Sequence, residues 1–333
     1  MRNLLLIILA ICPVGCNRGT TPESTHEVRV ALSRDGITWL PIRLAKTLGY
    51  FADQKLNVSV SDVAGLSKGM EALLGGSVEV TAGGLTQAIQ VAAEGRTVRT
   101  FVLFYRHPSM ALAIAPNMTG KINDIAGLKK RNVGITSPGS PTQQQLNFLL
   151  FTHGLSPADV SIVSIGTGAS SLSALEHGKV DAAILVGSAI GSFKNRNPNA
   201  VLLADTRSAE GAKAVFGSDF FPISGVLAQD GWLKANPGTA RRFAASVLKG
   251  MDWMRTHSAE DIRAKMPETD RMPDAEADLQ AIRDAQKLLS PDGVMPEAGP
   301  DRVRKFVEIS NDKVRTAKID LRSVYTNEFV TTK

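Results

Sequence analysis

A loop of small polar residues at 136–142 holds the side chains best suited to contact a ligand. An apolar strand ends at Ile135, the loop consists of Thr, Ser, Pro and Gly, and three leucines between 146 and 150 mark a following helix. The first turn of a helix leaves backbone N–H groups unpaired and carries the positive end of the helix dipole. Ser140 or Thr142 can add hydroxyl groups beside them. The pattern predicts a site for an anion or another polar ligand group, although an ordinary capped helix has the same features.

A second loop of this kind follows the next strand, at 166–171. Its sequence Gly-Thr-Gly-Ala-Ser-Ser is close to the dinucleotide fingerprint, but Ser171 replaces the third glycine and no acidic residue follows at the expected distance. The first loop likewise has the glycine spacing of a P-loop, but Ser140 stands where that motif needs lysine. A dehydrogenase and a nucleotide hydrolase are therefore disfavoured. The second loop still directs a helix N-terminus, with Thr167 and Ser170, toward the ligand of the first.

Residue types that usually carry catalysis show no suitable pattern. The five histidines lack the spacing of metal ligands, and no carboxylate pair or Ser-His-Asp arrangement stands out. Both cysteines, Cys12 and Cys16, lie near the N-terminus, so the rest of the chain has no thiol for catalysis or a disulfide. We predict no metal, no cofactor and no enzymatic activity.

The N-terminal segment has the features of an export signal. Arg2 precedes an apolar run at 4–11 that is too short for a comfortable membrane span. Gly15 directly precedes Cys16, as in bacterial lipoprotein signals. We predict a signal peptide at 1–15, lipidation of Cys16 and a flexible tether at 16–26, which would anchor an extracytoplasmic, periplasmic protein to a membrane. Cleavage by ordinary signal peptidase stays open, because Pro13 stands where such signals usually have leucine.

Composition and charge favour a globular protein without a nucleic-acid partner. The chain has 333 residues, which is long enough for two domains. Its residues are 43% hydrophobic and 21% charged, an ordinary balance for a globular protein. The net charge of +6 is modest, and the Lys and Arg residues form no basic stripe with interleaved aromatic residues.

Strands alternate with helices from residue 28 to about 228, which predicts an α/β protein with mostly parallel sheets. Residues 72–79 and 174–181 repeat the pattern Ala-Leu, Gly, Val and an acidic residue at identical spacing, which favours two related lobes. Helices predicted at 237–257, 259–266, 274–289 and 301–309 have no strands between them and would pack outside an existing sheet. We predict a first lobe formed by 27–115 and 225–333 and a second lobe formed by 116–224.

Several short motifs, in order, resemble one family of solute-binding proteins. The segment from Leu44-Ala45-Lys46 through Gly49-Tyr50-Phe51 to Leu56-Asn57-Val58 is similar to the opening of the nitrate/sulfonate/taurine and thiamine-pyrimidine family of ABC-importer binding proteins. The similarity continues at 72–79, 125–129, 134–142, 154–160, 178–183 and 324–329. Each motif is weak alone, but together they cover nearly the whole mature chain.

The resemblance implies a two-lobed type II periplasmic-binding fold that closes by hinge motion on a small-molecule ligand. It also implies an ABC permease and its ATPase as partners, and a monomer. The family's ligand contacts come from loops facing the cleft, although Trp39 could equally be a core residue. Carried over by position, the contacts are Ser33, Trp39, Gly65, Ser67, Gly84 and Thr86 in the first lobe and Ser137, Gly139, Ser140, Thr142, Thr167 and Ser170 in the second.

One departure from the family bears on the ligand. Many relatives have an acidic residue and proline where this chain has Val186 and Gly187. A ligand ammonium would lose its counter-charge there, so a taurine-like zwitterion is disfavoured. The fungal pyrimidine synthases of the same superfamily need a cysteine cluster that this chain lacks, which argues against an enzyme. A receptor for a sensor kinase and an enzyme that reuses the fold remain the alternatives to an importer subunit.

Overall fold

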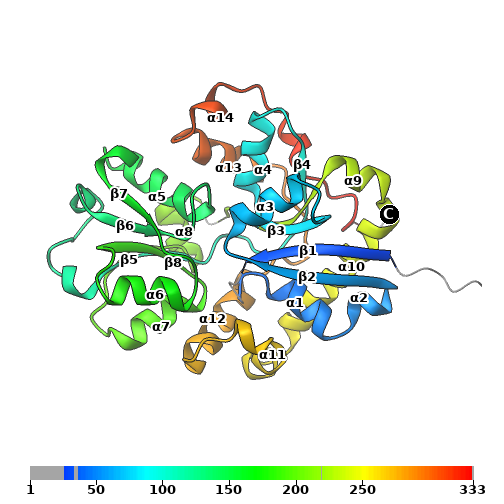
Figure 1. Cartoon of the computed structure of the whole chain (residues 1–333), viewed down its shortest axis with the longest axis horizontal. Coiled ribbons are helices and arrows are strands. Elements are labelled where there is room, and N and C mark those ends of the chain that lie inside the picture. Colours follow the sequence, from blue (N-terminus) through cyan, green and yellow to red (C-terminus); the bar gives the residue numbers. More distant parts are fainter. Residues whose placement is uncertain (1–25, 34–36, 219, 332–333) are drawn as a thin grey trace, which may run out of the picture.

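The computed structural model describes residues 26–33, 37–218 and 220–331, which form two lobes, each built on a five-stranded mixed sheet flanked by helices (Figure 1). The predicted α/β fold with two lobes is therefore confirmed. The predicted signal peptide, Cys16 and all of the predicted tether except its last residue lie outside the described residues. That last residue, His26, begins the first strand, because its amide donates to the Lys55 carbonyl at 3.3 Å and extends the sheet by one pairing.

The sheet of the first lobe has four strands in one direction and one reversed strand. β1 is parallel to β2 and β3, whereas β10 is antiparallel to β3 and β4. Alternation of apolar residues buries Val28, Val30 and Leu32 completely on one face of β1. In sheet order the strands are β2 (Leu56–Val63), β1 (His26–Ser33), β3 (Val80–Gly84), β10 (Ser224–Gln229) and β4 (Val98–Leu103).

The sheet of the second lobe repeats this arrangement. Here β6 is parallel to β7 and β8, and β5 is the reversed strand between β8 and β9. In sheet order the strands are β7 (Ser161–Ser164), β6 (Asn132–Ile135), β8 (Ala182–Val186), β5 (Met110–Ile114) and β9 (Leu202–Asp205).

The internal sequence repeat has the same structure in both lobes. Gly76 and Gly178 both have positive φ angles, 75° and 68°, at the turn that leads into β3 or β8. Three residues after Gly76 the Glu79 carboxylate accepts the Arg29 amide at 2.7 Å, and three residues after Gly178 the Asp181 carboxylate accepts the Asn132 amide at 2.8 Å. Glu79 therefore holds the start of β3 against β1, and Asp181 holds the start of β8 against β6.

Two chain segments cross between the lobes, and the first lies before the predicted boundary at 116. β5 pairs with β8 and β9, so Met110–Ile114 belongs to the second lobe and the crossing is at 104–109. All five residues of β5 are buried, and such an apolar run suits an inner strand of either sheet. The return crossing at 220–223 leads into β10, close to the predicted return at 225. The two crossings are joined by the Phe221 amide, which donates to the Arg106 carbonyl at 2.7 Å.

The helices that lead out of the strands flank the two sheets. In the first lobe these are α1 (Leu40–Thr47), α2 (Tyr50–Asp53), α3 (Leu66–Leu74), α4 (Leu85–Ala93) and α9 (Asp230–Ala235). In the second lobe they are α5 (Pro141–Thr152), α6 (Ala169–Glu176), α7 (Ser188–Arg196) and α8 (Ala209–Phe216).

The C-terminal helices are present where they were predicted, and two of them reach across to the second lobe. α10 packs on α1 and α2, whereas α12 lies beside α7 and α13 contacts both α4 and α5 (Figure 1). Asn195 donates to the Asp274 carboxylate at 3.3 Å across the α7–α12 contact. Within the described residues, every helix is too short or too polar to span a bilayer. The bounds are α10 (Pro237–Thr256), α11 (Ala259–Lys265), α12 (Ala275–Leu288), α13 (Gly299–Glu308) and α14 (Asp312–Thr316).

Candidate functional site

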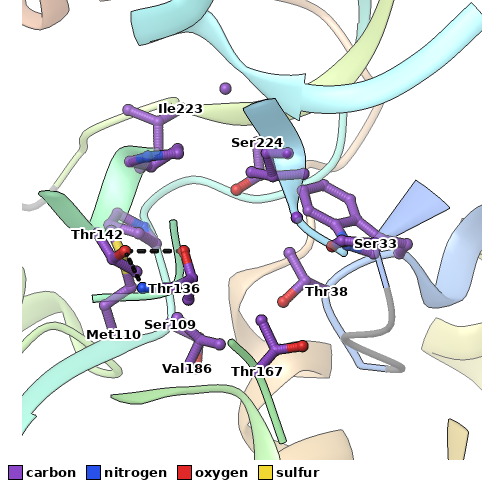
Figure 2. A pocket seen from close by; sticks show the side chains of 16 residues that line it. Ser33, Thr38, Ser109, Met110, Thr136, Thr142, Thr167, Val186, Ile223 and Ser224 are labelled. Carbon is purple, nitrogen blue, oxygen red and sulfur yellow. Dashed lines mark hydrogen bonds between the residues drawn. The ribbon is translucent and has the colours of Figure 1, made fainter. Parts of the chain in front are cut away.

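A cavity of about 50 Å³ lies between the two lobes, which we call the central cavity (Figure 2). A single water needs roughly 10 to 15 Å³ on this measure, so the closed lobes leave room for only a few waters. Side chains from both sheets and from both crossings line it. They are Ser33, Thr38, Trp39, Gly65, Leu66, Gly84, Pro108, Ser109, Met110, Thr136, Pro141, Thr142, Thr167, Val186, Ile223 and Ser224.

Six helices begin at the central cavity, three from each lobe. α1, α3 and α4 start directly after Trp39, Gly65 and Gly84, and α5 starts with the lining residue Pro141. α6 and α7 start two residues after Thr167 and Val186. The positive end of a helix dipole is equivalent to roughly half a charge, so the backbone makes this space favourable for negative charge.

The described lining residues contain no Asp, Glu, Lys, Arg or His, and seven of the sixteen are Ser or Thr. Hydroxyl groups can donate or accept a hydrogen bond, whereas helix N-termini only donate. The cavity therefore offers neutral donors in excess, next to the apolar side chains of Leu66, Met110 and Ile223.

Trp39 belongs both to the core and to the cavity wall. Its side chain is 2% exposed, and its ring lies 6.3 Å from that of Phe104. The indole Nε1–H donates to the Ser33 hydroxyl at 2.6 Å. The indole can thus offer a ligand its apolar surface but not its N–H group, while Ser33 keeps a hydroxyl proton to donate.

A chain of hydroxyl groups forms the second-lobe wall. Thr142 Oγ1 accepts the Thr136 amide at 3.0 Å and lies 2.9 Å from the Thr136 hydroxyl (Figure 2). It also lies 2.8 Å from the Ser140 hydroxyl. Thr142 has one proton, so it donates to one of these two hydroxyls and accepts from the other. If it donates to Thr136, the Thr136 proton is available to the cavity; if it donates to Ser140, Thr136 presents a lone pair. The wall can therefore meet an acceptor or a donor.

Three of the residues predicted to bind ligand, Ser67, Ser137 and Gly139, lie where the two lobes meet and do not line the central cavity. The Ser67 hydroxyl donates to the Pro138 carbonyl of the opposite lobe at 2.6 Å. A Cβ atom on Gly65 would lie only 2.9 Å from the Ser137 hydroxyl, and one on Gly139 would lie 3.6 Å from the Ser67 hydroxyl. Because Gly139 has a φ of 72°, glycine is favoured there by the backbone turn.

The structure thus brings six of the twelve predicted residues to the central cavity and leaves six outside its lining. Ser140 is fully buried as the N-cap of α5, and Ser170 donates to the Ile165 and Thr167 carbonyls at 2.9 Å within its own loop. Thr86 is fully buried, and its hydroxyl has no partner among the described residues. The lining residues are Ser33, Trp39, Gly65, Gly84, Thr142 and Thr167, and the others are Ser67, Thr86, Ser137, Gly139, Ser140 and Ser170.

Four lining residues at the crossings were not predicted from the sequence. Pro108 and Ser109 directly precede β5, Ile223 ends the return crossing and Ser224 begins β10. The apolar strands that begin at 110 and 224 could have indicated these residues, because the chain must pass the cleft wherever it changes lobe. Thr136 was missed although it belongs to the first polar loop.

One buried carboxylate interacts with Ser188, the first residue of α7. Asp278 of α12 is fully buried and accepts the Met272 amide at 2.7 Å and Arg263 Nε at 3.3 Å. Burial raises the pKa of Asp278, against the Met272 amide, the Ser188 hydroxyl and Arg263, which lower it. In the described part of the chain, no group of three His, Cys, Asp or Glu residues could hold a metal ion.

Two sheets of this topology, joined by two crossings around a cavity, define a periplasmic-binding-protein fold related to the binding proteins of ABC importers. A Bordetella bronchiseptica protein of known structure superposes with a TM-score of 0.87 at 31% identity, covering 92% of this chain and 96% of that one. The aliphatic sulphonate-binding protein SsuA of Escherichia coli superposes with a TM-score of 0.65 at 17% identity, covering 92% and 99%.

The chain belongs to the NMT1/THI5-like family, whose model matches residues 37–261. YtlA of Bacillus subtilis, which is named as a binding protein, is 23% identical over 298 residues, 87% of this chain and 85% of YtlA. The family also includes enzymes by name. The 4-amino-5-hydroxymethyl-2-methylpyrimidine phosphate synthase THI13 of Saccharomyces cerevisiae is 24% identical over 265 residues, 74% of each chain.

Proposed function

We propose that this chain is the solute-binding lipoprotein of an ABC importer. A lipid on Cys16 would hold the monomeric protein at the outer side of a membrane, in the periplasm or its equivalent. The two lobes would close on a small ligand and deliver it to a permease driven by an ATPase.

The observation that carries this proposal is the central cavity, with six helix N-termini around it and no ionised side chain among its described lining residues. Neutral donors can stabilise an anion without a mobile counter-ion, so the ligand is released when the lobes open and water returns. We therefore infer a small polar or anionic organic ligand, of a sulfonate-, nitrate- or pyrimidine-like kind. The likeness to SsuA supports this class of ligand.

The main alternative is an enzyme, because named synthases are among the relatives. The resemblance ties that activity to a cysteine cluster, and residues 17–333 contain no cysteine. A cavity without an ionised group among its described lining residues also offers no general acid or base in contact with a ligand. Both observations favour a binding protein over a synthase. A receptor for a sensor kinase would use the same cavity and differs only in its partner.

The test begins with the compound that copurifies with the full chain. Gentle denaturation and mass spectrometry identify it, and calorimetry then measures its binding. Thr167→Val should weaken binding, whereas Ser173→Ala, on the exposed side of α6, which follows Thr167, should not. A strain lacking the protein should lose uptake of the compound. Conversion of the compound by the purified chain would establish an enzyme, and intact uptake with a lost transcriptional response would establish a sensor.

A further inference from the structure

A second cavity, of about 300 Å³, opens on the side of the molecule where the chain returns between the lobes. We call it the hinge groove. Cavities of this size are at the lower end of those that hold small organic molecules. It is lined by Phe148, Phe216, Gly217, Ser218, Phe221, Arg302, Lys305, Phe306 and Ile309.

Four phenylalanine rings from four different segments form the apolar wall of the hinge groove. Phe216 at the end of α8 stacks on Phe221 of the return crossing, with ring centroids 4.1 Å apart and planes 12° apart. Phe306 of α13 lies 5.1 Å from Phe221 and 4.8 Å from Phe148 of α5. Phe221 and Phe306 are buried, whereas Phe148 and Phe216 are partly exposed. The groove therefore presents flat aromatic surface to a ligand.

Two cations stand one turn apart on the rim of the hinge groove. Arg302 donates to the Ser218 hydroxyl and, at 3.3 Å, to the Phe220 carbonyl, and both acceptors are neutral. Among the described residues, which omit Asp219, no carboxylate lies within ion-pair distance of Arg302. Lys305 is 2.9 Å from Asp301, in an exposed pair that exchanges easily with solvent. The rim is thus suited to a carboxylate or a similar anionic head group.

From this arrangement we propose that the hinge groove is a second binding site, for a small organic anion with an aromatic or short hydrocarbon body. The body lies against the phenylalanine rings, and the anionic group faces Arg302 and Lys305. The residues that line this site are different from those that line the central cavity.

The position of the hinge groove couples it to closure of the lobes. α5 contributes Pro141 to the central cavity and Phe148 to the groove, and the return crossing contributes Ile223 to the cavity and Phe221 to the groove. Because α5 and α8 belong to the second lobe and α13 packs on the first, a molecule in the groove contacts both lobes in their closed arrangement. Such a molecule binds the closed state preferentially and slows opening.

Benzoate is a suitable probe, with benzamide as its neutral analogue of the same shape, and saturation-transfer NMR and calorimetry on the full chain measure binding. We expect saturable benzoate binding that is stronger than benzamide binding. Arg302→Gln should weaken benzoate about tenfold or more and remove the preference over benzamide. Lys305→Gln serves in the same way if the first variant does not fold. Arg304→Gln, a charge removal on the same helix outside the groove, should bind benzoate as the wild type does.

A variant that changes only the central cavity separates the two sites. Thr167→Val removes a hydroxyl from the central cavity but keeps the size of the side chain, so the lobes can still close, and it should leave benzoate binding unchanged because Thr167 does not line the hinge groove. Loss of benzoate binding in Thr167→Val, or unchanged binding in both Arg302→Gln and Lys305→Gln, would overturn the proposal.

Discussion

Replacement of Thr142 by valine tests whether the hydroxyl chain of the second-lobe wall supports the fold. Valine has nearly the shape of threonine, so the change removes Oγ1 without opening a cavity. The hydroxyls of Thr136 and Ser140 can rotate toward other partners, but the Thr136 amide loses its acceptor, and both Thr136 and Thr142 are buried. An unpaired buried donor costs about 1 to 3 kcal/mol, so we expect a loss of that size in the free energy of unfolding.

Thr86 provides a matched control for this experiment. Like Thr142 it is the second residue of a helix and is buried, but its hydroxyl has no partner among the described residues. Thr86→Val should therefore be neutral or stabilising, because it removes a buried polar atom that gains nothing from the fold. Urea unfolding of both variants and the wild type gives midpoints and slopes from which the two free energies are compared. Equal stability of Thr142→Val and Thr86→Val would refute the hydroxyl chain.

Four further changes have expected outcomes. Cys16→Ser should release the protein from membranes, which fractionation measures, and a variant that still sediments with membranes would contradict lipidation. Trp39→Ala should cost about 3 to 5 kcal/mol of stability in urea unfolding, because the ring is buried; a loss of affinity alone would instead make it a ligand contact only. Gly139→Ala should cost about 1 to 2 kcal/mol through its φ of 72° and leave ligand affinity nearly intact, as calorimetry can check. Burial raises the pKa of Asp278, so the protonated carboxyl stabilises the fold at pH values below its unfolded pKa of about 3.9. This stability is lost as the pH rises through the folded pKa. Relative to Asp278→Asn, the wild type should therefore lose stability as the pH rises above about 4, and a constant difference in urea midpoint would contradict this.

The sequence predicted the two lobes but placed one strand, Met110–Ile114, in the wrong one. Alternating strands and helices, the repeat at 72–79 and 174–181, and the helices after 237 depend on local patterns, which are visible in a single chain. The assignment of Met110–Ile114 depends instead on pairing with β8 and β9, far along the chain, and a fully apolar strand fits either sheet.

The candidate site could be predicted only in part, for a related reason. Thr142 and Thr167 were found from the polar loops that follow two strands, and Ser33 and Gly84 were found through the resemblance to the family. Whether such a residue lines the central cavity or contacts the opposite lobe across the cleft depends on how the lobes approach each other. Ser67 became a cleft contact because the Pro138 carbonyl lies opposite it, which no local pattern records.

The reversed strands impose an order in which the lobes can be completed. β5 to β9 are continuous in the chain, so the second sheet can form as soon as residue 205 has emerged during synthesis. The first sheet must wait, because Thr100 of β4 pairs with Leu227 of β10, and β3 keeps an open edge until β10 arrives. Such distant pairing slows folding and leaves apolar strands exposed. The first lobe can therefore complete its sheet only after the second, and its apolar strands need protection from aggregation until β10 has been synthesised.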